Sequence, residues 1–80
     1  MARKLVFARS ARKHRIGKAH ALHVMRSGPP LVVPAAGDEL DDRWMWIGAD
    51  GRGVELEVIA LLLPQMLLVI HVMPTALRRG

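Results

Sequence analysis

The side chains best suited to chemistry in this 80-residue sequence are its histidines and arginines. A histidine can donate or accept a proton near neutral pH. An arginine can donate paired hydrogen bonds to a phosphate group and stabilise the charge that develops there. We single out five residues for roles of this kind: His71, Arg52, Arg43, Lys13 and His14.

Each of these residues also has a structural explanation. His71 is the one titratable group in the apolar run Met66–Met73, where a histidine bonded to the backbone can equally belong to the core. Lys13 and His14 precede a predicted helix and are also typical of a solvated turn. The sequence alone does not bring the candidates together, so both interpretations stay open.

Motifs for metals, nucleotides and covalent catalysis are weak or absent. His20 and His23 could share a metal ion, but two histidines without a third ligand make a poor site. The glycine-rich stretch Gly48–Gly53 lacks the Lys-Ser/Thr ending of a phosphate-binding loop. The two serines, Ser10 and Ser27, belong to no evident Ser-His-Asp arrangement. We therefore expect no metal and no cofactor.

The elements that must position the candidates are organised around the stretch Val54–Met73. Two apolar runs broken by Pro64-Gln65 predict a pair of antiparallel strands, Val54–Leu63 and Met66–Met73. Strict alternation along the second strand predicts one shared face for Leu67, Val69, His71 and Met73.

A transmembrane helix is the rival interpretation of this stretch. Residues 58–77 are long enough to span a bilayer, are mostly apolar and are followed by two arginines. Against this, Pro64 lies near the middle, and β-branched residues cluster on both sides of it. We therefore predict strands and no membrane span.

Charge is distributed unevenly along the chain. The net charge of +5 favours a polyanionic partner, and eight of the twelve basic residues precede position 27. All seven acidic residues lie between Asp38 and Glu57. The basic part could bind phosphate, could pair with the acidic middle, or could be a solvated face. The sequence has no cysteine, which excludes disulfides and fits a reducing cytoplasm.

Local signals predict the elements of the N-terminal half. Lys4–Ala8 predicts a short strand, and Arg9–Arg15 predicts a helical turn with Ser10 as its N-cap. Gly17 precedes a helix predicted over Lys18–Arg26. We expect its two histidines to face outward. The apolar side that we expect to pack on the sheet consists of Ala21, Leu22, Val24 and Met25.

The middle of the chain predicts a hairpin. Leu31–Val33 is a short strand candidate, residues 35–42 form a loop, and Arg43–Ile47 is the strand that pairs with Val54–Leu63. Trp44 and Trp46 alternate along it and should share a face. Such a pair serves as a partner interface or as core, and it can also stack on bases. We favour an interface or core role.

Several short motifs then follow one another in a set order. They are Arg12-Lys13-His14 before a helix, then Arg43, Ile47-Gly48, Arg52-Gly53 and two apolar strands with a basic tail. In this order and spacing, from about residue 11 to residue 79, the sequence resembles the BrnT-type toxins of type II toxin–antitoxin systems. These toxins belong to the RelE/ParE-like ribonuclease superfamily. No single motif carries the resemblance.

The resemblance implies one RelE/ParE-like domain over residues 1–80. It implies an α+β fold in which a small curved antiparallel sheet has one or two short helices packed on one face. It also implies a cytoplasmic, metal-independent endoribonuclease that a cognate antitoxin protein neutralises. The assembly would be a homodimer or a toxin–antitoxin hetero-oligomer.

In such an enzyme His71 would transfer a proton, and Arg43 and Arg52 would stabilise the phosphate. The RNA-binding residues would be Arg12, Lys13, Arg15, Arg78 and Arg79. The alternative from a different class is a noncatalytic basic module that binds nucleic acid or a partner protein through the same sheet. The order of the motifs favours the enzyme, whereas the scarcity of arginines after the last strand favours the binding module.

Overall fold

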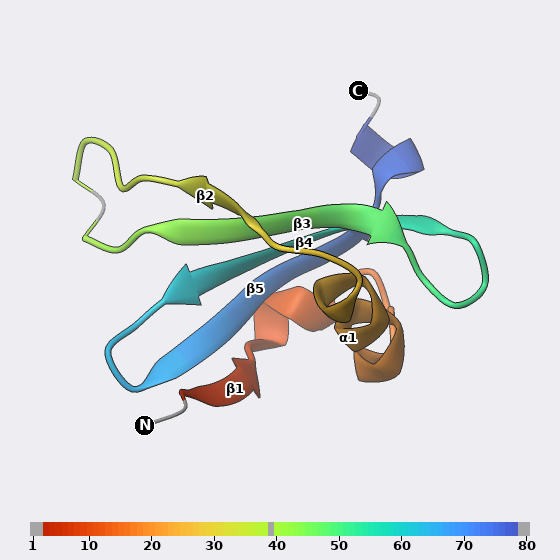
Figure 1. Cartoon of the computed structure of the whole chain (residues 1–80), viewed down its shortest axis with the longest axis horizontal. Coiled ribbons are helices and arrows are strands. Elements are labelled where there is room, and N and C mark those ends of the chain that lie inside the picture. Colours follow the sequence, from red (N-terminus) through yellow and green to blue (C-terminus); the bar gives the residue numbers. More distant parts are fainter. Residues whose placement is uncertain (1–2, 39, 79–80) are drawn as a thin grey trace.

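The computed structural model describes residues 3–38 and 40–78. Its elements, in chain order, are β1 (Lys4–Phe7), the 3₁₀ turn η1 (Arg9–Arg12), α1 (Lys18–Arg26), β2 (Leu31–Val33), β3 (Arg43–Ala49), β4 (Glu55–Leu62), β5 (Met66–Pro74) and the 3₁₀ turn η2 (Thr75–Arg78). The strands form one five-stranded sheet in the order β1-β5-β4-β3-β2 (Figure 1). One helix and two 3₁₀ turns beside this open sheet confirm the predicted small α+β fold.

The predicted central pair is confirmed. β4 and β5 run antiparallel, from Leu56 opposite Pro74 to Leu62 opposite Leu67. The backbone N–H of Leu63 donates to the carbonyl of Met66 at 3.0 Å, which closes the turn at the proline. Among the residues that the structure describes, no helix combines the length and the apolar character that a membrane crossing requires.

The sheet is mixed, whereas an antiparallel sheet was expected. β1 runs parallel to β5, with Lys4 opposite Met66 and Phe7 opposite Val69, and the three other pairs are antiparallel. Parallel neighbours need a long crossover connection. Here the chain between β1 and β5 makes that crossover, and no local signal in the sequence specifies so distant a pairing.

Helix α1 covers one side of the sheet, which we call the helix face. The helix follows Gly17 as its N-cap, as predicted, and buries Ala21 and Val24. These two pack in the core with Trp46 of β3 and with Val58 of β4. The core consists of Ala11, Ala21, Val24, Trp46, Leu56, Val58, Ala60, Val69 and Val72. The predicted orientation of the helix is therefore confirmed, since its apolar side meets the sheet.

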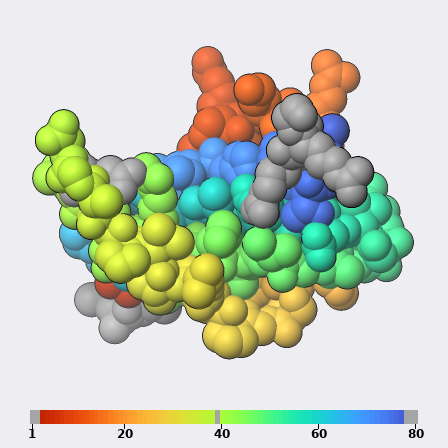
Figure 2. Space-filling view, turned by 90° about the horizontal axis from the view of Figure 1, so that it is seen from above, coloured from red at the N-terminus to blue at the C-terminus, as the bar shows by residue number. Residues whose placement is uncertain are grey.

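The other side of the sheet, which we call the open face, carries the side chains that alternate with this core. Directly paired residues share a face, so Ile47 opposite Glu57 and Ile59 opposite His71 lie together on it. The one α-helix of the described residues packs on the helix face instead. In Figure 2 the colours of β2 to β5 follow one another across the molecule, with the N-terminal segment beyond β5 and the end of the described chain over part of the surface.

Candidate functional site

A β-bulge in β5 determines where His71 points. Ala60 pairs with Val69, but the neighbouring Ile59 pairs with His71, so Ile70 has no residue directly opposite it on β4. Our prediction that Val69 and His71 share a face is therefore wrong. The extra residue breaks the two-residue alternation, which sends Val69 into the core and His71 onto the open face.

On the open face His71 meets a buried carboxylate. Its Nε2 lies 3.1 Å from Oε1 of Glu57, whose side chain is only 9% exposed. The His71 ring is 30% exposed, so it contacts both the carboxylate and solvent. Nε2 is buried and makes no aligned hydrogen bond within the described residues. The contact is therefore an ion pair when the ring is protonated, and Nδ1 is the nitrogen left for a ligand.

The bulge also docks the segment that carries a second histidine. Ser10 of η1 donates its hydroxyl to the carbonyl of Ile70 at 2.7 Å, and the N–H of Ala8 donates to Val69 at 2.8 Å. Ser10 was predicted as the N-cap of this turn, but that position belongs to Ala8, which makes no side-chain cap. The hydroxyl satisfies a carbonyl at the irregular point of β5 instead.

His14 follows this docked turn and lies beside His71. The two ring centroids are 6.3 Å apart, and the ring planes meet at 80°. Arg15 takes a positive φ of 57°, a conformation that a non-glycine residue rarely adopts. The chain reverses there towards α1 while His14 stays against β5. Two of the five predicted catalytic residues are thus brought together, and with Glu57 they form what we call the histidine cluster.

Glu57 was not among the predicted site residues. It appeared in the sequence as one of two acidic residues near the start of a central strand. Its position diagonal to His71 depends on the bulge, because Glu57 pairs with Met73. A carboxylate in an otherwise apolar strand was the available signal, since a buried acid needs a positively charged partner.

The basic residues before α1 lie next to this cluster along the chain. Arg12, Lys13 and Arg15, which we call the basic arm, are all exposed and flank His14 in sequence. Exposed cations that flank one of the two imidazoles in sequence suit an anionic ligand.

Arg52 lies in a different cluster, in the β3–β4 hairpin. Its Nε and Nη2 donate to Oδ2 of Asp50 at 3.0 and 2.8 Å. The backbone N–H groups of Arg52 and Val54 donate to Oδ1 of Asp50 at 2.8 and 3.0 Å. Nδ1 of His20 lies 3.4 Å from Oδ2. His20, Asp50 and Arg52 form what we call the hairpin cluster, which links this turn to α1. The prediction that His20 faces outward is therefore wrong, because its ring lies against Asp50.

The Asp50 carboxylate is fully buried in this cluster and stays ionised. Burial raises its pKa, but the hydrogen bonds from the Arg52 side chain and from the Val54 and Arg52 backbone outweigh that effect. The pKa falls from its usual 3.8 to about 2. Arg52 is occupied with this carboxylate, and α1 lies on the side of the sheet opposite His71. The structure therefore does not bring Arg52 to the histidine cluster.

The remaining arginines predicted for the site are Arg43, Arg78 and Arg79. Arg43 lies on the open face but on β3, opposite Leu61 rather than opposite the Ile59–His71 pair. Arg78 ends η2, directly after β5. Arg79 lies outside the described residues. Among the arginines that the structure describes, Arg43 is the one that lies on a strand, and the register places it on the same sheet face as His71.

The two tryptophans lie on the helix face. They make an edge-to-face pair with ring centroids 6.0 Å apart, and they share a face as predicted. Trp46 is 6% exposed and belongs to the core, so an interface role does not fit it. Trp44 is half-buried and packs against the core. Of the two roles left open, the core explains Trp46.

Metal ligation finds little support among the residues that the structure describes. No three histidine or acidic side chains gather there as a metal ion would require. His20 contacts Asp50, and the ring of His23 lies near Gly51. The two histidines that could have shared a metal are thus set against the hairpin.

Comparisons with protein-family models, with curated proteins and with solved structures found no match for this chain. The resemblance to the BrnT-type toxins therefore rests on the order and spacing of the sequence motifs. The histidine cluster is the part of the structure that suits chemistry, with two imidazoles side by side, a carboxylate beside one of them, and exposed cations next to the other in sequence.

Proposed function

We propose that this protein is a metal-independent endoribonuclease of the toxin type, acting through His14 and His71 on the open face. The observation that carries the proposal is the convergence of the histidine cluster. His14 comes from the N-terminal segment, Glu57 from β4 and His71 from β5, with 6.3 Å between the two imidazoles and 3.1 Å between His71 and Glu57. Two adjacent imidazoles supply a base and an acid without a metal ion.

The reaction is an internal transfer of the phosphate. His14 takes the proton of a ribose 2′-hydroxyl, and that oxygen attacks the adjacent phosphorus. The new O2′–P bond forms while the P–O5′ bond breaks, and the leaving 5′-oxygen receives a proton from His71. The products are a 2′,3′-cyclic phosphate and a 5′-hydroxyl, and no water is consumed in this step. After the products leave, His14 releases its proton to solvent and His71 takes one up, which restores both imidazoles and leaves the cyclic phosphate intact.

The two histidines are assigned by their surroundings. The Glu57 carboxylate compensates the positive charge of a protonated His71, which suits the acid. His14 has exposed cations on both sides in sequence, which can bind the phosphate, so we assign to it the proton transfer from the adjacent 2′-hydroxyl. Glu57 is a positioning residue, because it contacts His71 and not the substrate.

RNA binding in this proposal falls to the basic arm. Its three side chains are exposed and carry charge that phosphates can neutralise. Arg43, which lies on the open face, provides a further contact for the bound RNA. In this proposal the protein is a cytoplasmic toxin, and a cognate antitoxin protein neutralises it by covering the open face. The toxin is a homodimer or part of a toxin–antitoxin hetero-oligomer.

The second candidate function is a noncatalytic module that binds RNA or a partner protein through the same basic arm. The exposure of Arg12, Lys13 and Arg15 favours it, because binding needs these cations and not the imidazoles. The two functions differ in whether bonds in the RNA are broken.

The test is cleavage of a labelled single-stranded RNA by the purified full chain, with EDTA present. The enzyme is expected to leave 2′,3′-cyclic phosphate ends and to lose this activity in the His14→Gln/His71→Gln double variant. Induced expression should arrest growth with the wild type and not with the double variant. Binding of RNA without cleavage would support the module instead, and cleavage that EDTA abolishes would contradict the metal-independent mechanism.

A further inference from the structure

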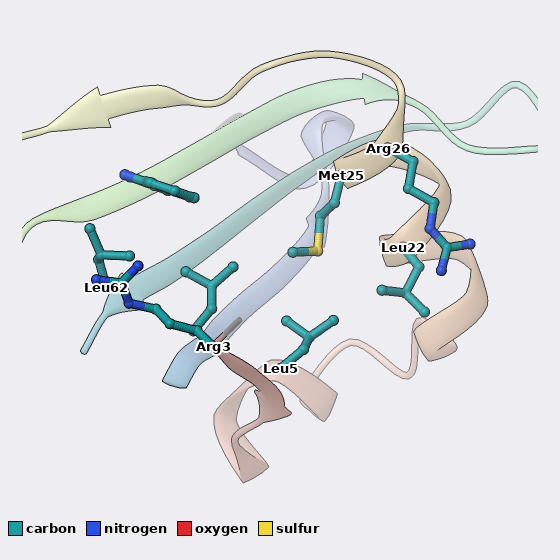
Figure 3. A pocket seen from close by; sticks show the side chains of 8 residues that line it. Arg3, Leu5, Leu22, Met25, Arg26 and Leu62 are labelled. Carbon is teal, nitrogen blue, oxygen red and sulfur yellow. The ribbon is translucent and has the colours of Figure 1, made fainter. Parts of the chain in front are cut away.

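A pocket of about 410 Å³ lies between α1 and the sheet, on the helix face and away from the histidine cluster. Leu5 of β1, Leu67 of β5 and Leu62 of β4 line it and pair in register, Leu5 with Leu67 and Leu67 with Leu62. In Figure 3 the side chains of Leu5 and Met25 point into the space between the sheet and the helix.

The interior of this pocket is apolar. The residues that form it are Leu5, Leu22, Met25, Trp44, Leu62 and Leu67. Leu5 is 39% exposed although it belongs to this lining, so the pocket leaves apolar surface in contact with water. A cavity of this size and character falls within the range used for small ligands.

Two arginines complete the lining, Arg3 and Arg26, and no acidic residue does. Nε of Arg3 donates to the carbonyl of Leu63 at 2.9 Å, which fixes the guanidinium beside the end of β4. Its terminal nitrogens and the whole guanidinium of Arg26 make no hydrogen bond or ion pair within the described residues. In Figure 3 the two arginines lie toward opposite ends of the pocket.

We propose that this pocket binds a small amphipathic carboxylate, with an apolar chain in the cavity and its carboxylate on an arginine of the rim. The apolar lining selects the chain, because burying it removes both surfaces from water. The guanidinium groups select the carboxylate, which accepts paired hydrogen bonds from them. The proposal does not depend on ribonuclease activity, because the pocket and the histidine cluster lie on opposite faces.

A compact ligand suits this site better than a partner protein. The pocket is one open recess beside α1 lined by eight residues, whereas a protein partner buries a broad area with polar residues around its edge. Among the residues that line it, charge is positive throughout, so an anion fits better than a neutral or cationic amphiphile.

The test is titration of the ¹⁵N-labelled full chain with decanoate, at concentrations below those at which decanoate forms micelles. Saturable shifts are expected for Trp44, Leu22 and Met25, with little change at His14 and His71. Decanol, which has the same chain and no charge, should bind about tenfold more weakly, because a charge-assisted hydrogen bond is lost.

Variants separate the charge from the cavity. The Arg3→Gln/Arg26→Gln double variant should bind decanoate about tenfold more weakly and decanol unchanged. Arg9→Gln, an exposed arginine of η1 outside the pocket, is the matched control and should bind both as the wild type does.

Three results would overturn the proposal. Shifts that grow linearly with decanoate indicate nonspecific partition of a surfactant. If the wild type binds decanoate and decanol with equal affinity, the arginines do not contribute to binding. This comparison needs no variant, so it decides the question even if the double variant fails to fold. Sedimentation of the chain with phosphatidylglycerol vesicles, without saturable decanoate binding, assigns the arginines to a membrane surface instead.

Discussion

The histidine cluster and the hairpin cluster each place a histidine against a buried carboxylate, but the two carboxylates are bonded differently. Asp50 accepts four hydrogen bonds, two from the Arg52 side chain and two from the backbone, and His20 lies only at its edge at 3.4 Å. Glu57 lies 3.1 Å from Nε2 of His71, yet that nitrogen has no aligned hydrogen bond in the described residues.

This difference separates structure from chemistry. The Asp50 carboxylate accepts hydrogen bonds at both oxygens and thereby fixes the turn. Asp50 and His20 therefore have a structural role and no role in catalysis. A histidine held by one carboxylate, partly exposed and next to a second imidazole, can still exchange a proton with a ligand. A histidine–carboxylate pair is thus a weak sign of function by itself. A stronger sign is a histidine in such a pair that can still form a hydrogen bond to a ligand.

The largest expected effect comes from replacing His71 with glutamine. His71→Gln should lower RNA cleavage by at least about 100-fold, because a general acid or base typically contributes that much. Folding and RNA affinity should stay near normal. His20→Gln, the matched change in the hairpin cluster, should alter the cleavage rate by less than about twofold.

Single-turnover cleavage, thermal melting and RNA binding of these two variants check this prediction. If His71→Gln fails to fold, the core explanation of this histidine gains support. If the variant folds and cleaves at the wild-type rate, His71 leaves the mechanism, and His14 with Lys13 becomes the place to look.

Glu57→Gln should lower the cleavage rate about tenfold, because it removes the charge that compensates a protonated His71. With one imidazole protonated and one neutral in the active form, the wild-type rate should follow a bell-shaped pH profile. The Glu57→Gln/His71→Gln double variant should be no slower than His71→Gln alone, because Glu57 acts through His71. A structural effect of Glu57→Gln would instead add to the loss caused by His71→Gln.

Asp50→Asn should act in the opposite way, lowering the melting temperature by several degrees and leaving cleavage below that temperature intact. The pKa of Asp50 is about 2 in the fold against 3.8 ordinarily, so its ionised form stabilises the folded state. That contribution is complete above about pH 4 and is lost as the pH falls through about 2.

Urea unfolding of the wild type and of Asp50→Asn over this pH range checks the sign. The difference in unfolding free energy should be constant near neutral pH and should shrink below about pH 4. A difference that does not change with pH would show that the carboxylate stabilises the turn by shape alone.

The sequence predicted the strands and the helix because these follow from local periods. The apolar runs around Pro64 predicted the central pair, the glycine-rich stretch predicted the hairpin between β3 and β4, and Gly17 marked the start of α1. β3 runs two residues further into the glycine-rich stretch than predicted, because Gly48 and Ala49 pair with β4. The parallel pairing of β1 with β5 joins the two ends of the chain, and no local pattern specifies it.

The candidate site could be predicted only in part for the same reason. His14 and His71 were chosen by their chemistry, but their meeting depends on the bulge at Ile70, which alternation cannot predict. Arg52 was wrongly assigned to the phosphate site because the sequence signal next to it was not used. An aspartate two residues before it, in a glycine-rich turn, is typical of a side chain that bonds to the following backbone.

The basic arm offers a smaller effect on binding. Replacing Arg12, Lys13 and Arg15 with alanine should weaken RNA binding and lower the salt slope of log K by about 2, because fewer counterions are released from a single strand. Arg12→Lys/Arg15→Lys keeps all three charges and should keep the slope. Binding measured over a range of salt concentrations decides between them, and an unchanged slope in the alanine variant would remove the arm from the RNA site.

The smallest expected effect separates the charge of the arm from its backbone. Arg15 has a φ of 57°, which is unfavourable for any residue with a Cβ and open to glycine. Arg15→Gly should therefore raise the free energy of unfolding, by less than about 1 kcal/mol, since glycine also gains entropy in the unfolded chain. Arg12→Gly, at an ordinary 3₁₀ position, should instead lower it by about 0.5–1 kcal/mol.

Both glycine variants remove one positive charge, so both should lower the salt slope of RNA binding by about 0.7. Urea unfolding and salt titration of the same two proteins thus give opposite signs for stability and equal shifts for binding. Equal losses of stability at the two positions would mean that the turn at Arg15 is not strained. The positive φ of Arg15 would then impose no cost that glycine relieves.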